Sequence, residues 1–166
     1  MTRSKHVFHG LLFLIFLSSL VSKAPSLAPW QTLPALEALM SLLPLAAVLW
    51  AVGRGSFPGL VLLAISALTQ LDSLFLMIGA STVSGLAGLA GLASGVALLG
   101  RLAAVAAFYT DNPTSLYLDW RRSEREQRDL AVEVAVFLAA LFLSVLPQLI
   151  YYAVYWRELY GALTLS

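Results

Sequence analysis

Five polar or charged side chains lie inside apolar stretches of this sequence, and they are the residues best placed to do chemistry. They are Glu37, Asp72, Arg101, Glu133 and Gln148. Asp72 is the most informative, because a carboxylate within a segment apolar enough to cross a membrane needs a partner or a proton. Such a group can serve a proton relay, an ion path or a contact between helices. The sequence leaves two roles open: a functional Asp72, or a hydrogen-bonded Asp72 that only holds helices together.

The expected partner of Asp72 follows from counting residues along helices. Only Ser81 and Thr82 separate the apolar stretch that contains Asp72 from the next one, so the two stretches should form an antiparallel hairpin. In that hairpin Arg101 differs from Asp72 in depth by about 16 Å, which excludes a direct pair. Gln148, in the last apolar stretch, lies at a matching depth, and its amide can donate to a carboxylate. We therefore expect Asp72 to contact Gln148.

The other charged residues are expected nearer the ends of their helices. Arg101 should extend toward the inner face of the membrane, where Glu133 is its better partner. Glu37, near the outer end of its stretch, can pair with Lys23. Simple anchoring of helix ends explains Arg101 and Glu133 equally well, and Glu37 needs no functional role.

The fourth apolar stretch carries glycines at three- and four-residue intervals. They include Gly85, Gly88, Gly91 and Gly95, interleaved with alanine and leucine. Small residues at this spacing let two helices approach closely in a membrane, where packing rather than hydrophobicity joins helices. We expect this glycine face to pack tightly, either within the chain or against a partner subunit.

Composition sets the class of protein that must position these residues. Of the 166 residues, 60% are hydrophobic and 11% are charged, whereas a soluble domain has about 45–50% and 25%. A soluble fold is therefore excluded. The net charge of +1 gives no field that would recruit nucleic acid. The absence of cysteine excludes disulfides and thiolate metal sites, and no metal-ligand pair or cofactor motif is present, so no metal or cofactor is expected.

Five apolar stretches predict an all-α, polytopic transmembrane helical bundle that forms one domain over residues 1–166. The predicted spans are residues 7–21, 33–52, 59–80, 83–109 and 130–156, and the polar segment 110–129 is an inner loop. Two interpretations of the first stretch remain open, because residues 1–24 resemble a signal peptide with a small-residue cleavage site. A retained helix gives about five spans, and a cleaved one gives four.

Basic residues in the short loops predict the orientation. With the first helix starting inside, the inner side collects seven of them, namely Arg3, Lys5, Arg54, Arg121, Arg122, Arg125 and Arg128. The outer side holds Lys23 and Arg157. We expect an outer C-terminus, and an inner N-terminus if the first segment is retained.

No phosphate loop, nucleophile elbow or dinucleotide fingerprint occurs, so an enzyme is not expected. The leading hypothesis is a multi-pass integral membrane protein that acts through contacts with other membrane proteins in the bilayer. It would serve as a trafficking adaptor or as an accessory subunit of a larger complex. The alternative is a small transporter or proton-conducting subunit centred on Asp72.

Several short motifs resemble the angiotensin II receptor-associated protein family. They are the run Leu49-Trp50-Ala51-Val52, a polar turn, an apolar helix ending in Leu71-Asp72, then Arg101 and, eight residues later, Tyr109. The resemblance covers about residues 41–109. It implies a small multi-span resident of the endoplasmic reticulum, Golgi, vesicles and plasma membrane that binds a receptor tail and influences receptor trafficking.

This chain departs from that family's pattern at three points. The turn before the third span is shorter, Leu102 stands where proline is expected, and a fifth span replaces the polar cytoplasmic tail. If receptor binding depends on that tail, it does not carry over. An endomembrane is the favoured location, with the mitochondrial inner membrane as the alternative.

Overall fold

The computed structural model describes residues 2–27, 32–80, 82–110 and 127–164, with side chains over 6–27, 35–80, 82–108 and 130–156. The helices are α1 (Thr2–Ser22), α2 (Ala24–Leu27), α3 (Thr32–Met40), α4 (Leu43–Gly53), α5 (Phe57–Leu68), α6 (Ser73–Ala80), α7 (Leu86–Thr110) and α9 (Gln127–Thr164). These described ranges form helices and turns and contain no β-strand, which confirms the all-α prediction. Residues 111–126, which hold most of the predicted inner loop, lie outside the described residues.

Three helical stretches are long and apolar enough to cross a membrane, namely Ala35–Gly53, Leu86–Phe108 and Leu130–Trp156. The pair Phe57–Leu68 and Ser73–Ala80 meets the same criterion together but is bent by 54°, as in a broken span or a re-entrant loop. The stretch His6–Ser22 is apolar but shorter. The described residues thus supply three candidate spans, or four if the bent pair crosses once. A fifth span rests on the sequence alone.

The predicted third span, 59–80, is two helices instead of one. Helices α5 and α6 are joined by a link, residues 69–72, in which backbone N–H groups donate to carbonyls three residues back, as Ser73 N does to Gln70 O at 3.0 Å. The Thr69 hydroxyl donates to a carbonyl one turn back at 3.1 Å. Because these tight turns pair backbone groups on both sides of the bend, the chain can change direction among apolar neighbours at a lower cost in unpaired polar groups.

The predicted second span, 33–52, is also interrupted, between α3 and α4. Pro44 lies in the first turn of α4, and a proline ring there disfavours a continuous helix through the preceding turn. The two residues before α4, Ser41 and Leu42, form the break, and the Ser41 hydroxyl donates to Ala38 O at 2.7 Å. The break brings Ser41 to the same cavity as the link 69–72.

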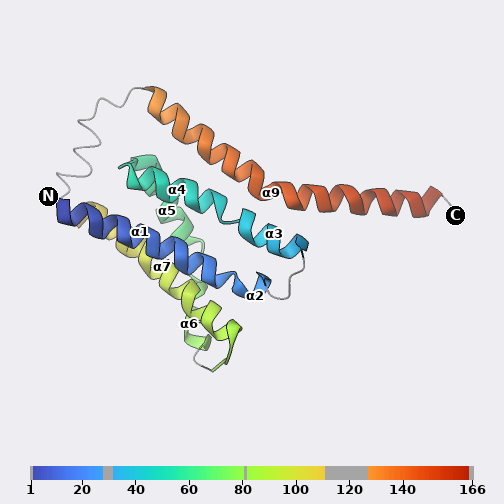
Figure 1. The fold of residues 1–166 in the computed structure, drawn as a ribbon, viewed down its shortest axis with the longest axis horizontal. Coiled ribbons are helices and arrows are strands. Elements are labelled where there is room, and N and C mark those ends of the chain that lie inside the picture. Colours follow the sequence, from blue (N-terminus) through green and yellow to red (C-terminus); the bar gives the residue numbers. More distant parts are fainter. Residues whose placement is uncertain (1, 28–31, 81, 111–126, 165–166) are drawn as a thin grey trace.

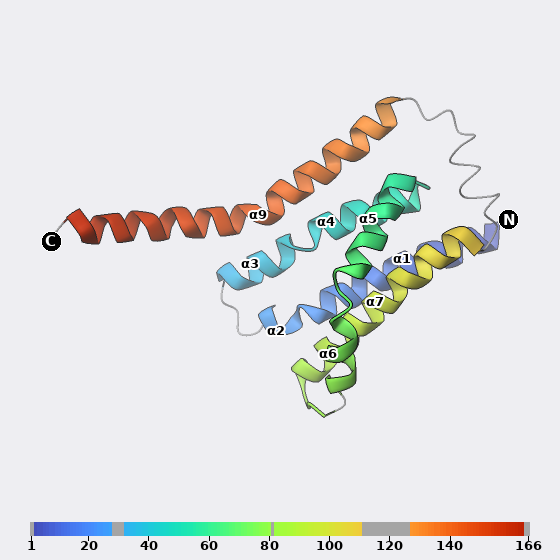
Figure 2. The same cartoon turned by 180° about the vertical axis from the view of Figure 1, so that it is seen from behind.

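Helices α1 and α7 lie side by side and run in opposite directions (Figures 1 and 2). Helix α6 folds back on the first half of α7, and α4 pairs with α5 through a tight turn that contains Gly55 at φ 80°. The start of α1, the α4–α5 turn and the end of α7 are gathered at one end of the molecule (Figure 1). The same end is the predicted inner side.

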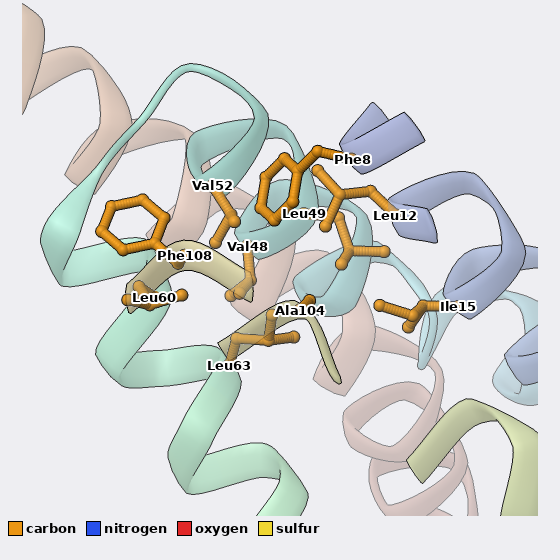
Figure 3. Packing of buried hydrophobic residues seen from close by; sticks show 10 residues of the cluster. All are labelled: Phe8, Leu12, Ile15, Val48, Leu49, Val52, Leu60, Leu63, Ala104 and Phe108. Carbon is orange, nitrogen blue, oxygen red and sulfur yellow. The ribbon is translucent and has the colours of Figure 1, made fainter. Parts of the chain in front are cut away.

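The hydrophobic core lies at that end, where four helices meet (Figure 3). Its ten residues are Phe8, Leu12 and Ile15 from α1, Val48, Leu49 and Val52 from α4, Leu60 and Leu63 from α5, and Ala104 and Phe108 from α7. The core therefore fixes the ends of α1 and α7 and leaves a more polar region farther along both helices.

Helix α9 packs along α3 and α4 over its first part, then extends beyond the other helices (Figures 1 and 2). It continues through Pro147, although this residue cannot donate a backbone hydrogen bond. The helix changes direction about midway along its length (Figure 1). Only 11% of its span is buried, against 39% for the candidate span in α7.

Candidate functional site

Arg101 is the buried charge around which the candidate site is built. It lies in α7 about 10 Å along the helix axis from Phe108, and only 4% of its surface is exposed. A charged side chain within an apolar helix is costly to bury, so it normally faces protein partners or a polar cavity. Arg101 does both.

Two neighbouring segments hold the guanidinium in place. Nη1 donates to Gln70 Oε1 on the α5–α6 link, and Nη2 donates to Ser19 Oγ on α1 at 3.2 Å. The third nitrogen, Nε, is buried and has no hydrogen-bond partner among the described residues. Arg101 thus joins three segments that are distant in sequence, and these contacts use two of its five N–H donors.

A cavity of about 480 Å³ adjoins Arg101. Its other charged lining residues are Lys23 and Asp72, and its polar lining residues are Ser19, Ser22, Ser41, Thr69, Gln70, Ser73 and Ser94. Leu42, Leu45 and Ala97 complete the wall. The breaks between α3 and α4 and between α5 and α6 supply four of these polar and charged residues, namely Ser41, Thr69, Gln70 and Asp72.

Asp72 lines this cavity together with Arg101, although the residue count separated the two by about 16 Å in depth. The hydrogen bonds of Arg101 go to Gln70 and Ser19, so the direct Arg101–Asp72 pair that the count excluded is not among them. The count of residues assumed a two-residue turn and an unbroken helix. Instead α7 begins at Leu86, three residues later than the count assumed, and the chain unwinds at residues 69–72. These two changes bring the link and Arg101 to one level.

The predicted contact of Asp72 with Gln148 is also wrong. Gln148 Nε2 donates to Glu37 Oε1 at 2.7 Å. Matching depth does not decide which helices are neighbours, and α9 packs against α3 and α4, away from α6 (Figure 2). The same packing explains why Glu37 contacts Gln148. Glu37 and Lys23, which were expected to pair, both line a smaller cavity of about 270 Å³.

Glu133 does not pair with Arg101, contrary to the sequence-based expectation. It is buried, and its Oε2 accepts a hydrogen bond from Ser56 Oγ at 2.6 Å. Ser56 is the N-cap of α5, where its Oγ also accepts from Gly59 N at 3.3 Å. Glu133 therefore attaches the start of α9 to the α4–α5 turn.

The glycines of α7 have different surroundings. A Cβ on Gly91 would lie 2.9 Å from both Ala80 Cβ and Leu76 O, and one on Gly95 would lie 2.5 Å from Met77 Cβ. Both glycines thus face α6. A Cβ on Gly88 would meet the carbonyl oxygen of Val83 in the preceding turn, at 2.2 Å. Gly85 does not belong to the packed glycine face on which the sequence analysis placed it. A Cβ there would meet nothing within 4 Å, and its φ of +79° is that of a turn before α7.

Reasoning from the sequence missed Ser19 and Gln70 as partners of Arg101, and Lys23 as a wall of its cavity. For Ser19 and Gln70 the sequence contained a signal. Ser18-Ser19 interrupts the apolar run of the first helix, and Thr69-Gln70 precedes Asp72 inside an otherwise apolar stretch. Among the described residues, no group of three or more histidine, aspartate or glutamate side chains is placed to hold a metal ion.

Comparisons with protein-family models, with curated proteins and with solved structures find no match to this chain. The resemblance to the angiotensin II receptor-associated protein family therefore stays a prediction from short motifs. One of these motifs is placed differently by the structure, since Leu71-Asp72 lies in the link after α5 instead of ending a helix.

Proposed function

We propose that this chain is a multi-pass membrane protein that binds a small solute in the cavity beside Arg101 and acts as a small transporter. The observation that carries the proposal is the burial of Arg101 against a polar cavity of about 480 Å³. This develops the alternative hypothesis from the sequence, but it moves the centre of the site from Asp72 to Arg101.

Two physical arguments support solute binding. A buried arginine costs about 2.5–3.5 kcal/mol or more in a membrane helix. If the role of residue 101 were purely structural, a leucine would stabilise the protein better. In addition, discontinuous helices at membrane depth are tolerated where the irregular backbone lines a cavity, and transporters build substrate sites there. The α5–α6 pair, bent by 54°, adjoins this cavity.

The proposal keeps the five-crossing topology predicted from sequence. In it α1 and the α5–α6 pair each cross once, the N-terminus and the Arg54 turn face inside, and the C-terminus faces outside. The proposal requires that α1 is retained, since α1 supplies Ser19 to Arg101 and Ile15 to the core. The membrane is an endomembrane or the mitochondrial inner membrane.

Single cysteines introduced into this cysteine-free chain test the proposal. Ser94→Cys places a thiol on the cavity wall, and Ser144→Cys is its matched control on α9. In both serines the hydroxyl donates to the carbonyl three residues back, at 2.8 Å for Ser94 and 2.7 Å for Ser144, but Ser144 does not line this cavity.

In proteoliposomes, a membrane-impermeant methanethiosulfonate reagent should modify Ser94→Cys and spare Ser144→Cys. Modification from either side, in vesicles of opposite orientation, is the result expected for a transporter. Modification from one side only would restrict the function to solute binding. A Ser94→Cys thiol that reacts no faster than Ser144→Cys would overturn the proposal.

A second candidate function, the accessory subunit or adaptor expected from the sequence, is favoured by α9. Its outer half exposes Tyr151, Tyr152 and Tyr155, with the rings of Tyr151 and Tyr155 stacked at 6.4 Å. Aromatic residues are enriched at protein interfaces and also at membrane interfaces. Purification in mild detergent should yield a stoichiometric membrane partner that Tyr151→Ala and Tyr155→Ala release. A pure monomer from native membranes would exclude this function.

A further inference from the structure

We infer that the solute bound beside Arg101 carries a carboxylate or phosphate group, held by the guanidinium. This inference rests on the proposed function and adds the chemical class of the ligand. It depends on three observations: the charge balance of the cavity wall, the remaining donors on Arg101, and the depth of the site.

The charge balance of the wall favours an anion. Lys23 and Arg101 contribute two positive charges and Asp72 contributes one negative charge, which leaves a formal balance of +1. Hydroxyl and amide groups make up most of the remaining lining. Away from bulk water, a fixed charge acts more strongly than at a surface, and a cleft focuses its field on the solute.

The guanidinium is held in a fixed position beside the cavity and retains donors for an oxyanion. Gln70 and Ser19 hold the two terminal nitrogens, so the plane of the group is fixed before a ligand arrives. The buried Nε–H remains without a partner among the described residues. A carboxylate or phosphate accepts two parallel N–H donors from one edge of a guanidinium, and these charge-assisted bonds are about twice as strong as those an uncharged acceptor makes.

The depth of the site selects a dissolved anion over a lipid headgroup. Arg101 lies within the apolar span Leu86–Phe108, about 10 Å from its nearer end. Lipid phosphates lie at the membrane surface, where Arg54 is stacked on Trp50 with 4.8 Å between the guanidinium carbon and the ring. The ligand should therefore bind in detergent micelles that contain no phospholipid.

The test compares two thiol reagents of similar size and opposite charge on Ser94→Cys. Ser94 and Arg101 line the same cavity. Sulfonatoethyl methanethiosulfonate is anionic, and trimethylammonioethyl methanethiosulfonate is cationic. After correction for their rates with a free thiol, the anionic reagent should react faster by about tenfold or more, the low end of the effect of a charged cleft.

Two further variants move this ratio in opposite directions. Arg101→Gln in the Ser94→Cys background should abolish or reverse the preference. Asp72→Asn should increase it, because it removes the negative charge that Asp72 contributes to the wall. Arg54→Gln, at the end of α4, is the control that changes net charge equally and should leave the ratio unchanged. Asp72→Asn retains Arg101, so it gives a result even if Arg101→Gln fails to fold.

Competition identifies the ligand class directly. Sodium phosphate or sodium acetate should slow modification of Ser94→Cys in lipid-free micelles, whereas choline chloride at the same ionic strength should not. Equal rates for the two reagents, a cationic preference, or protection only after anionic lipid is added would overturn the anion inference while the cavity proposal stands. A thiol that no reagent reaches would overturn both.

Discussion

The region around α1 and α7 and the region formed by α9 use the same kinds of residue in opposite ways. Of the span in α7, 39% is buried inside the protein. Its polar side chains Ser94 and Arg101 line a cavity together with polar side chains from other segments. Of the span in α9, 11% is buried, and most of its large apolar side chains are exposed. Among the described residues, its polar contacts with the other helices include Ser56–Glu133 and Glu37–Gln148.

This difference shows how burial in a membrane protein separates two tasks. A span buried by its own chain can hold charged groups at a fixed geometry, because neighbouring helices supply partners for them. An exposed span such as α9 has lipid or another protein as its neighbour. Substitutions should therefore have large effects in the first region and small effects in the second, and the predictions below test this contrast.

The largest expected effect is at Ile15, which is fully buried between α1, α4 and α7. Ile15→Ala should lower the free energy of unfolding by about 2–5 kcal/mol, since it leaves a cavity in the core. Leu141→Ala in α9, where the side chain is 43% exposed, should change it by less than about 0.5 kcal/mol. Reversible denaturation in detergent measures both. Equal losses would remove the contrast between the regions.

The contact between α6 and α7 should give the next largest effect. Gly91→Leu has no room beside Ala80 Cβ and Leu76 O, and overpacking of this kind costs about 1–3 kcal/mol. Gly79→Leu is the matched control on α6, because a Cβ there meets nothing within 4 Å. Thermal unfolding in detergent should show a lower midpoint for Gly91→Leu than for Gly79→Leu. A stable Gly91→Leu variant would mean that α6 and α7 are not in contact.

The helical class and the membrane character of the chain could be predicted from its sequence, because long apolar runs have few other stable structures. Close packing of Gly91 and Gly95 was also expected from the spacing of the glycines, although the sequence left open whether their neighbour lies in this chain or in a partner subunit. These features depend on local composition and on neighbours in the sequence.

The site could not be predicted in the same way, for two physical reasons. The break at residues 69–72 depends on competition between polar side chains and the helix backbone, which a count of 1.5 Å per residue ignores. The second reason is that the arrangement of the helices around the bundle cannot be counted from the sequence. Depth along the membrane normal can be counted, but which helices are neighbours is set by packing of the whole bundle, and so Gln148 met Glu37 in place of Asp72.

An effect of similar size is expected at the buried contact between α9 and the α4–α5 turn. Ser56→Ala removes the donor to Glu133 Oε2 and the N-cap of α5, and hydrogen bonds to charged groups contribute about 1.5–3 kcal/mol. Ser66→Ala is the control, because its hydroxyl bonds only to the Leu63 carbonyl on its own helix, at 2.8 Å. Urea denaturation should separate the two variants. The same midpoint for both would show that Ser56–Glu133 does not stabilise the fold.

The smallest effect on stability should come from the exposed contact between Glu37 and Gln148. Gln148→Ala removes one hydrogen bond between helices, and such bonds in membrane proteins contribute about 0.6 kcal/mol on average. The Glu37–Gln148 contact is nevertheless informative, because it identifies the helices that pack against α9. A short bis-methanethiosulfonate crosslinker should join Glu37→Cys to Gln148→Cys, since the two side chains approach to 2.7 Å. The same reagent should not join Asp72→Cys to Gln148→Cys, because α9 packs on α3 and α4. The reverse pattern would place α9 against α6. Gln148 would then be the partner of Asp72, as the count of residue depths predicted, and the packing of α9 on α3 and α4 would be wrong.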